Sequence, residues 1–180
     1  MDFIENIVIG AGVLGLATAR KLQLENNNVL LIEKHGHVFS ETSSRNSEVI
    51  HSGIYYEEGS LKNNLCLKGR DLLYDYLKKN NIPHKKCGKL IVGNGSEDQK
   101  QKLDQLAAKA VKKNIAITVY EKSYMQKKFN FLKSTDNIFV HETGIFDSHE
   151  YGMGLLKDFE NNGGLINYIN ALDSFKRKDG

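Results

Sequence analysis

The sequence predicts an α/β protein in which a parallel β-sheet is accompanied by helices and joined to part of a mixed α+β region. Two short runs of β-branched and aliphatic residues, at positions 3–9 and 29–33, predict strands that are covered on both faces, as in a parallel sheet. A glycine-rich turn and a helical pattern join the two runs within about 30 residues, which is the size of a β-α-β unit.

The elements after this unit are less regular. A polar, irregular stretch is expected at 35–44. A long helix is expected at 60–81, because Ser60 is a suitable N-cap and Pro83 prevents continuation of the helix. The helix of the β-α-β unit itself carries apolar or small residues at helical spacing, and the asparagines at 26–28 are expected to end it.

The second half of the chain also alternates apolar runs with helical patterns. Ser96 and Gln99 have the spacing of a capping box, which predicts a helix that continues to about residue 113. A helix at 148–161 is expected in spite of two glycines. Strands are expected at 89–92, 115–120, 138–141, 165–169 and 171–176. Asp179-Gly180 after the last run is a hairpin signal.

The composition excludes several classes of protein. The chain has 180 residues, 40% hydrophobic and 26% charged, which is typical of a soluble globular protein. The net charge of +3 comes from dispersed lysines, so no nucleic-acid-binding stripe is expected. Cys66 and Cys87 lack the spacing of a disulfide framework or a metal site. With acidic residues near the N-terminus in place of a signal peptide, this predicts a cytoplasmic location.

The turn at residues 10–15 has the spacing Gly10-x-Gly12-x-x-Gly15, and Glu33 ends the second predicted strand. In this context Gly10 permits a tight turn, Gly12 lets a pyrophosphate approach the backbone, and Gly15 lets the helix pack on the strand. The helix N-terminus favours the anion, and Glu33 accepts hydrogen bonds from a ribose. This predicts a Rossmann-like FAD/NAD(P)-binding fold. The irregular continuation favours FAD, with an NAD-binding module as an alternative.

A second distinctive stretch carries a family resemblance. Together with the glycine turn, it resembles the FAD-dependent oxidoreductases of the D-amino-acid-oxidase superfamily and, among them, the L-2-hydroxyglutarate oxidases and dehydrogenases. The matching segments are Ser43-Ser44-Arg45-Asn46-Ser47, Val49-Ile50-His51, residues 53–56, 59–62, 87–92 and 143–147. The resemblance covers nearly all of this chain, but only the N-terminal portion of a complete member.

The resemblance implies FAD-dependent oxidation of a 2-hydroxy acid to the 2-oxo acid, with oxygen or a quinone-type carrier as the electron acceptor. It places the ADP half of FAD on the glycine turn and Glu33, and the pyrophosphate and flavin along Ser43, Ser44, Arg45, Asn46 and Ser47. His51 is expected near the isoalloxazine and is the best candidate for proton handling. Arg45 could instead pair with an anion. No metal site is expected.

Two alternatives stay open. Ser43-Ser44-Arg45 is closer to glycerol-3-phosphate dehydrogenases, so a relative of those enzymes or of the amino-acid oxidases is the first. The second is a non-catalytic remnant, or a subunit that needs a partner chain for its missing half. The expected domains are an FAD-binding region at 1–82 and 137–180 and a partial substrate region at 83–136. Alone, the chain is expected to bind FAD poorly; a longer member could associate peripherally with a membrane.

Overall fold

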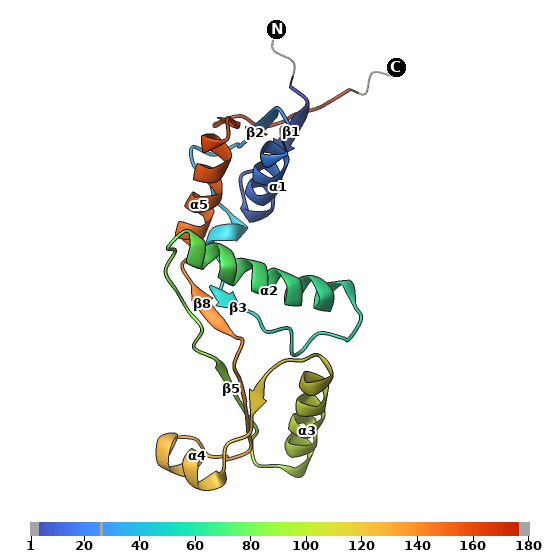
Figure 1. The fold of residues 1–180 in the computed structure, drawn as a ribbon, viewed down its shortest axis with the longest axis vertical. Helices are drawn as coiled ribbons and strands as arrows, with labels where there is room; N and C mark the ends of the chain where they lie inside the picture. The colour runs from blue at the N-terminus through green and yellow to red at the C-terminus, as the bar shows by residue number, and fades with distance from the viewer. Residues whose placement is uncertain (1–3, 26, 177–180) are drawn as a thin grey trace. The chain divides into compact units, whose positions relative to one another are not determined.

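A computed structural model describes residues 4–25 and 27–176 of the chain (Figure 1). The chain divides into two compact units, Met1–Ser47 with Asp147–Gly180, and Glu48–Phe146. The predicted domain boundaries at 82–83 and 136–137 lie inside the second unit, because pairing between strands ties the segments on either side of them together. The assignment of the predicted domains to FAD and to substrate stays a prediction.

The first unit contains the predicted parallel sheet. Its strands β1 (Asn6–Ile9), β2 (Val29–Ile32) and β9 (Leu165–Asn167) lie in the order β1-β2-β9, and both pairings are parallel. The helix α1 (Val13–Leu24) connects β1 to β2 and packs beside α5 (Ser148–Asn161), which precedes β9 (Figure 1). The β-α-β prediction is therefore confirmed, although the first strand begins at Asn6; Phe3 lies outside the described residues.

The sheet of the first unit buries only one face among the described residues. Val29 and Leu31 are fully buried, whereas Ile7 and Ile9 are 55% and 58% exposed and Leu165 is 56% exposed. Successive side chains of a strand point to opposite faces, so this alternation marks one covered and one open face. The prediction of strands covered on both faces is wrong for this part of the chain, because α1 and α5 account for one layer only.

The second unit holds two small antiparallel sheets. One contains β3 (Val49–Ile50), β8 (Gly144–Phe146) and β4 (His84–Lys85) in that order. The other contains β5 (Lys89–Val92), β7 (Asn137–Val140) and β6 (Ile117–Thr118). The unit also has the helices α2 (Leu61–Lys79), α3 (Glu97–Lys112) and α4 (Lys122–Lys128). Its buried cluster is formed by Ile54, Leu103, Ala110, Ile115, Ile138 and Val140.

The helix starts follow from local capping. Ser60 accepts a hydrogen bond from the N–H of Asn63 at 3.1 Å, and Ser96 accepts one from the N–H of Gln99 at 3.3 Å. In a complete capping box, the side chain of Gln99 would accept a hydrogen bond from the N–H of Ser96. Here the N–H of Ser96 donates instead to the side chain of Asn94 at 3.0 Å. Both predicted helices are confirmed within two residues of their expected ends.

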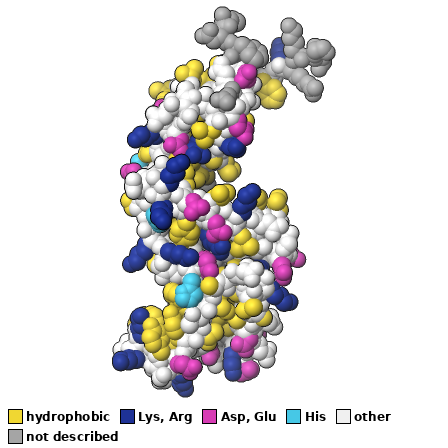
Figure 2. All heavy atoms as spheres, in the orientation of Figure 1, with side chains coloured by type: hydrophobic (Ala, Val, Ile, Leu, Met, Phe, Trp, Pro, Cys, Tyr) yellow, Lys and Arg dark blue, Asp and Glu magenta, His cyan; other side chains and the backbone are white. Residues whose placement is uncertain are grey.

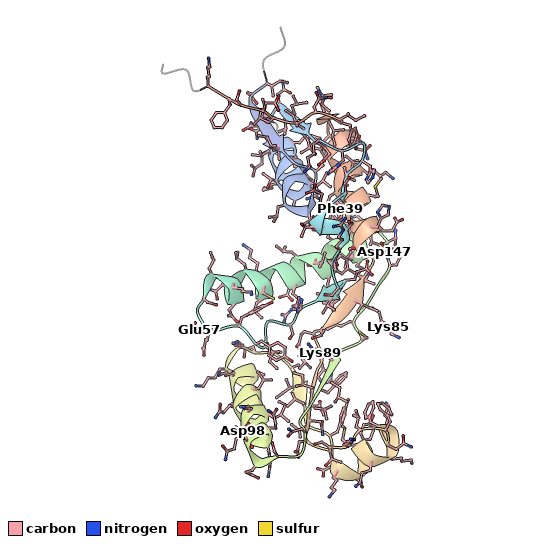
Figure 3. All side chains as sticks on the ribbon, turned by 180° about the vertical axis from the view of Figure 1, so that it is seen from behind. Phe39, Glu57, Lys85, Lys89, Asp98 and Asp147 are labelled. Carbon is pink, nitrogen blue, oxygen red and sulfur yellow. The ribbon has the colours of Figure 1, made fainter. Side chains whose placement is uncertain are left out.

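Close packing explains one of the two glycines in α5. The side chain of Phe39 (labelled in Figure 3), in the segment predicted to be irregular, is buried and lies against Gly152. A Cβ on Gly152 would lie 2.5 Å from the Phe39 ring, which is closer than packed carbon atoms approach. Glycine lowers the helix propensity at this position, but only glycine leaves room for the Phe39 ring.

Other differences from the sequence predictions are local. Residues 171–176 form no strand, and the hairpin signal at Asp179-Gly180 lies outside the described residues. β3, β4, β8 and α4 were not predicted, whereas β6 lies inside the strand predicted at 115–120. No helix within residues 4–25 and 27–176 is long and apolar enough to cross a membrane. Basic and acidic side chains are interspersed on the face shown in Figure 2.

Candidate functional site

The turn between β1 and α1 has the backbone geometry that its glycines predict. Gly10 adopts φ +93°, which an L-amino acid with a side chain rarely takes up, and its N–H donates to the carbonyl of Ile32 at 2.8 Å. A Cβ on Gly15 would lie 1.8 Å from the carbonyl oxygen of Gly10. The helix therefore begins directly against the turn, and only glycine allows this approach.

The N-terminus of α1 is open to an anion. Gly12 is its N-cap and offers no side chain, and no acidic residue lies in the first turn. The Oγ of Ser43 lies here and accepts a hydrogen bond from the N–H of Val13 at 2.9 Å. A Cβ on Gly12 would lie 2.9 Å from this oxygen. The partial positive charge of the helix end is thus left for a ligand, and Ser43 adds a hydroxyl beside it.

Glu33 is a buried acid at the carboxyl end of β2, with 6% of its surface exposed. Its Oε2 accepts a hydrogen bond from the N–H of Ala11 at 2.7 Å, and its Oε1 accepts one from the N–H of His35 at 2.9 Å. A carboxylate has about four acceptor positions, so about two remain for other donors. The main chain of Glu33 also bonds to Asn167 and Asn170, which fixes the side chain between the turn and the segment after β9.

These groups line one cavity of about 420 Å³ in the first unit. Gly10, Gly12, Glu33 and Ser43 all contribute to its wall, so the structure brings four of the predicted residues together. Gly15 lies behind the turn and acts through packing. The further lining residues are Ile9, Ile32, Lys34, His35, Ser40, Glu41, Thr42, Asn170, Ala171 and Leu172.

An ionic cluster lies at the wall of this cavity. Glu41 contacts the ammonium of Lys34 at 2.7 Å and the imidazole of His35 at 3.0 Å. The hydrogen bonds from Lys34 and His35 lower the pKa of Glu41 to about 2. Lys34 and His35, which follow Glu33, are thus both paired with Glu41 of the same loop. The predicted site did not include them. Their position directly after Glu33 is the signal that could have found them.

The residues after Ser43 take different positions. The side chain of Asn46 donates to the carbonyl of Ser43 at 2.9 Å and to the hydroxyl of Ser148 at 3.0 Å, so it supports the loop from outside the cavity. The Oγ of Ser44 donates to a carbonyl of its own turn. Arg45 and Ser47 are exposed, and neither lines the cavity. Their predicted place along a pyrophosphate or flavin stays a prediction.

His51 belongs to the second unit. Its residue is exposed and borders a small pocket together with Ser52–Tyr56, Lys89 and Thr143. The ammonium of Lys89 lies 5.0 Å from the centre of the Tyr55 ring, within the range of a cation–π contact (Figure 3 labels Lys89). The structure thus places His51 in a pocket with an aromatic ring and a cation, and its predicted place beside a flavin stays a prediction.

The cavity of the first unit suits the adenosine diphosphate half of a dinucleotide. Its polar groups are a helix N-terminus whose cap residue has no side chain and the Ser43 hydroxyl, both suited to a pyrophosphate, and a buried carboxylate with spare acceptor positions for ribose hydroxyls. The glycine turn removes the side chains that would fill the space between them. The segment after β9 lines the cavity with Asn170–Leu172, although the sequence predicted a strand from residue 171 onward.

The family model and the similar curated proteins both indicate an oxidoreductase. The family of FAD-dependent oxidoreductases, DAO, matches residues 6–180. The chain is 40% identical over 158 residues to the mitochondrial L-2-hydroxyglutarate dehydrogenase of Arabidopsis thaliana, covering 86% of this chain and 32% of that protein. It is 32% identical over 163 residues to the human protein of the same name, covering 89% and 35%. The chain thus spans about a third of these relatives.

Solved structures agree on the fold. Reduced L-α-glycerophosphate oxidase from Mycoplasma pneumoniae, with FAD bound, has a TM-score of 0.84 and 25% identity over 94% of this chain and 45% of that one. L-Proline dehydrogenase from P. horikoshii has a TM-score of 0.85 at 15% identity, which speaks for the fold alone.

The predicted cytoplasmic location is contradicted by the relatives, which are named mitochondrial proteins. The prediction rested in part on the spacing of the two cysteines, and this spacing does not identify a compartment. The family match covers nearly the whole chain and agrees with the geometry of the cavity. This chain therefore belongs to the family of FAD-dependent oxidoreductases, whose cofactor is FAD.

Proposed function

We propose that the protein oxidises a 2-hydroxy acid of the L-2-hydroxyglutarate type to the corresponding 2-oxo acid. The observation that carries this proposal is the 32–40% identity to proteins named L-2-hydroxyglutarate dehydrogenase over most of this chain. The solved structures whose names contain other substrates are 25% identical or less. Because the chain spans about a third of those relatives, the activity is proposed for the protein as expressed from its full reading frame.

The residues of the first unit bind and orient the cofactor in this proposal. The N-terminus of α1 and the Ser43 hydroxyl hold the pyrophosphate, and Glu33 accepts hydrogen bonds from the ribose. An acid at this position disfavours a 2′-phosphate because two anions would meet. Bound FAD supplies an acceptor for the two electrons and the hydrogen that leave the substrate as hydride.

The residues that would handle the substrate lie elsewhere in the chain. A ring nitrogen of His51 takes the proton of the substrate hydroxyl as the C2 hydrogen leaves as hydride, which forms the carbonyl of the 2-oxo acid. Arg45 is an exposed planar cation and pairs with an anionic group of substrate or cofactor. Oxygen or a quinone-type carrier would serve as the final electron acceptor.

A second candidate is oxidation of glycerol 3-phosphate. It is favoured by Ser43-Ser44-Arg45 and by the similarity to the Mycoplasma pneumoniae oxidase. Both substrates carry an anion beside a secondary alcohol, so the same proton and hydride transfers would apply. The two candidates differ in the anion that the protein must recognise.

Anaerobic reduction of the bound flavin tests the proposal. Protein expressed from its full reading frame is loaded with FAD and mixed with L-2-hydroxyglutarate, its D-enantiomer, glycerol 3-phosphate or an amino acid. Loss of the visible flavin absorption with L-2-hydroxyglutarate alone is expected. Bleaching with glycerol 3-phosphate alone establishes the second candidate. Retained FAD with no bleaching by any compound refutes both, as does binding of NAD without FAD.

A further inference from the structure

The loop at residues 51–56 has its carbonyl oxygens held by side chains of two helices. The Sγ of Cys66 donates to the carbonyl of His51 at 3.5 Å, and the guanidinium of Arg70 donates to that of Ser52 at 3.4 Å. Both donors lie on α2. A third donor, Lys113, comes from the end of α3 and binds the rest of the loop.

Lys113 makes three contacts with this loop. Its Nζ donates to the carbonyl oxygens of Gly53 and Ile54, each at 3.3 Å, and to that of Tyr56. An ammonium has three N–H donors, so one group satisfies all three carbonyls. Hydrogen bonds with a charged donor are about twice as strong as those between neutral groups. Within the described residues, these contacts hold the half of the loop that carries the aromatic side chains.

The position of Lys113 is fixed by its own backbone. It is the C-cap of α3, and Asn114 follows at φ +53°. The N–H of Asn114 donates to the carbonyl of Val111 at 3.0 Å, and the N–H of Ile115 donates to that of Ala110 at 2.9 Å. These two bonds form a Schellman motif, which ends the helix at a defined residue. Lys113 therefore projects from a rigid helix end.

The loop and the helix end share one hydrophobic cluster. Ile54, Ala110 and Ile115 are all buried in it, with exposures of 3% or less. Ile54 is held there by its side chain while its carbonyl is held by Lys113. The loop is thus fixed on both its apolar and its polar side, although residues 51–56 form no regular secondary structure of their own.

We propose that Lys113 is a positioning residue, which fixes the loop carrying His51 and Tyr55 by binding the carbonyls of Gly53, Ile54 and Tyr56. This inference rests on the proposed function, in which His51 takes the substrate proton. Lys113 itself touches no reacting atom. Its effect is to hold the backbone from which His51 and Tyr55 reach the pocket shared with Lys89.

The test compares Lys113→Met with Lys112→Met in the FAD-loaded protein. Lys112 is exposed, lies one residue earlier on the same helix, and carries the same charge, so it controls for the loss of a cation. Lys113→Met is expected to increase amide hydrogen exchange at residues 53–56 at least tenfold. It is also expected to lower kcat per bound flavin by about 10- to 100-fold, since a misplacement of about 1 Å can cost that much. Lys113→Arg is expected to restore part of the rate.

Each outcome decides a separate point. Unchanged exchange at residues 53–56 overturns the proposal. Faster exchange with unchanged kcat per bound flavin also overturns it, because Lys113 then contributes to stability alone. Equal effects of Lys112→Met and Lys113→Met indicate a general charge effect and overturn it as well. If no 2-hydroxy acid reduces the flavin of the unaltered protein, the proposed function fails. The comparison of hydrogen exchange still decides whether Lys113 fixes the loop.

Discussion

Substitution of Gly15 by alanine is the sharpest perturbation of the cofactor site. A Cβ at this position would lie 1.8 Å from the carbonyl oxygen of Gly10 and 3.0 Å from its carbonyl carbon. A carbon and a carbonyl oxygen in contact are ordinarily separated by about 3.3 Å, so the two segments must move apart by about 1.5 Å. Neither can yield by a rotamer change, because the contact is with the backbone of the turn.

Two opposing effects set the magnitude. Alanine in a helix interior gains about 1 kcal/mol over glycine through its higher helix propensity. Overpacking a rigid contact costs about 1–3 kcal/mol, and occasionally more. Because the contact is with backbone and the overlap is large, the upper end applies. We expect Gly15→Ala to lower the free energy of unfolding by about 1–2 kcal/mol. The displaced turn also weakens FAD binding by at least about tenfold, which corresponds to about 1.4 kcal/mol.

Gly69 provides a matched control. It also lies inside a helix, α2, and a Cβ there would meet no atom within 4 Å. Gly69→Ala therefore shows the propensity gain alone and should stabilise the protein by about 0.5–1 kcal/mol. For a chain of this size, each kcal/mol of added stability raises Tm by about 2–4 °C.

The assay combines urea unfolding of both variants with a fluorescence titration of FAD. Gly15→Ala should lose both stability and affinity, whereas Gly69→Ala should gain stability and keep its affinity. If Gly15→Ala matches Gly69→Ala in both measurements, the contact between the helix and the turn does not restrict the residue. The reasoning about the dinucleotide turn would then be wrong.

Three further changes test other contacts. Glu33→Gln leaves one acceptor oxygen for two N–H groups, including that of Ala11, so urea unfolding should show a loss of about 1–3 kcal/mol; unchanged stability would contradict these bonds. Lys34→Gln should raise the pKa of Glu41 from about 2 in an NMR titration. Since folding lowers the pKa of Glu41, its ion pair with Lys34 is fully formed above the ordinary carboxyl pKa and is lost as the pH falls towards 2. A Glu41 pKa that is unaffected by Lys34→Gln would exclude this ion pair. Ser60→Ala should cost about 1 kcal/mol through its lost cap, and no change in the unfolding midpoint would show that water replaces it.

The β-α-β unit was predictable because its signals are local. The glycine turn, the helix caps and the two apolar runs each act over a few residues, and all of them agree. The predictions that fail depend on what packs against a segment. The open face of β1, with Ile7 and Ile9 exposed, has the same residue types as a covered face, so periodicity alone does not distinguish the two.

The segment after β9 shows a second kind of failure. Residues 171–176, predicted as the last strand, form no strand in the structure. The main chain is engaged earlier, where the N–H of Asn170 donates to the carbonyl of Glu33 at 3.0 Å and the N–H of Ile169 donates to that of His35 at 3.1 Å. These bonds direct the chain over the cavity, and Leu172 becomes part of its wall. Tertiary hydrogen bonding thus overrides the strand propensity of the segment.

The same distinction separates the two groups of predicted site residues. Gly10, Gly12 and Glu33 converge because the carboxyl ends of neighbouring parallel strands meet at one edge of a sheet, which is a property of the β-α-β unit itself. His51 follows β3, whose two residues pair with β8 almost 100 positions later in the chain. Spacing within a motif carries no information about such a partner. The convergence of Gly10, Gly12 and Glu33 on one cavity could therefore be predicted, whereas the lysine that holds the His51 loop, Lys113, is found only once α3 and the loop are seen to share a core.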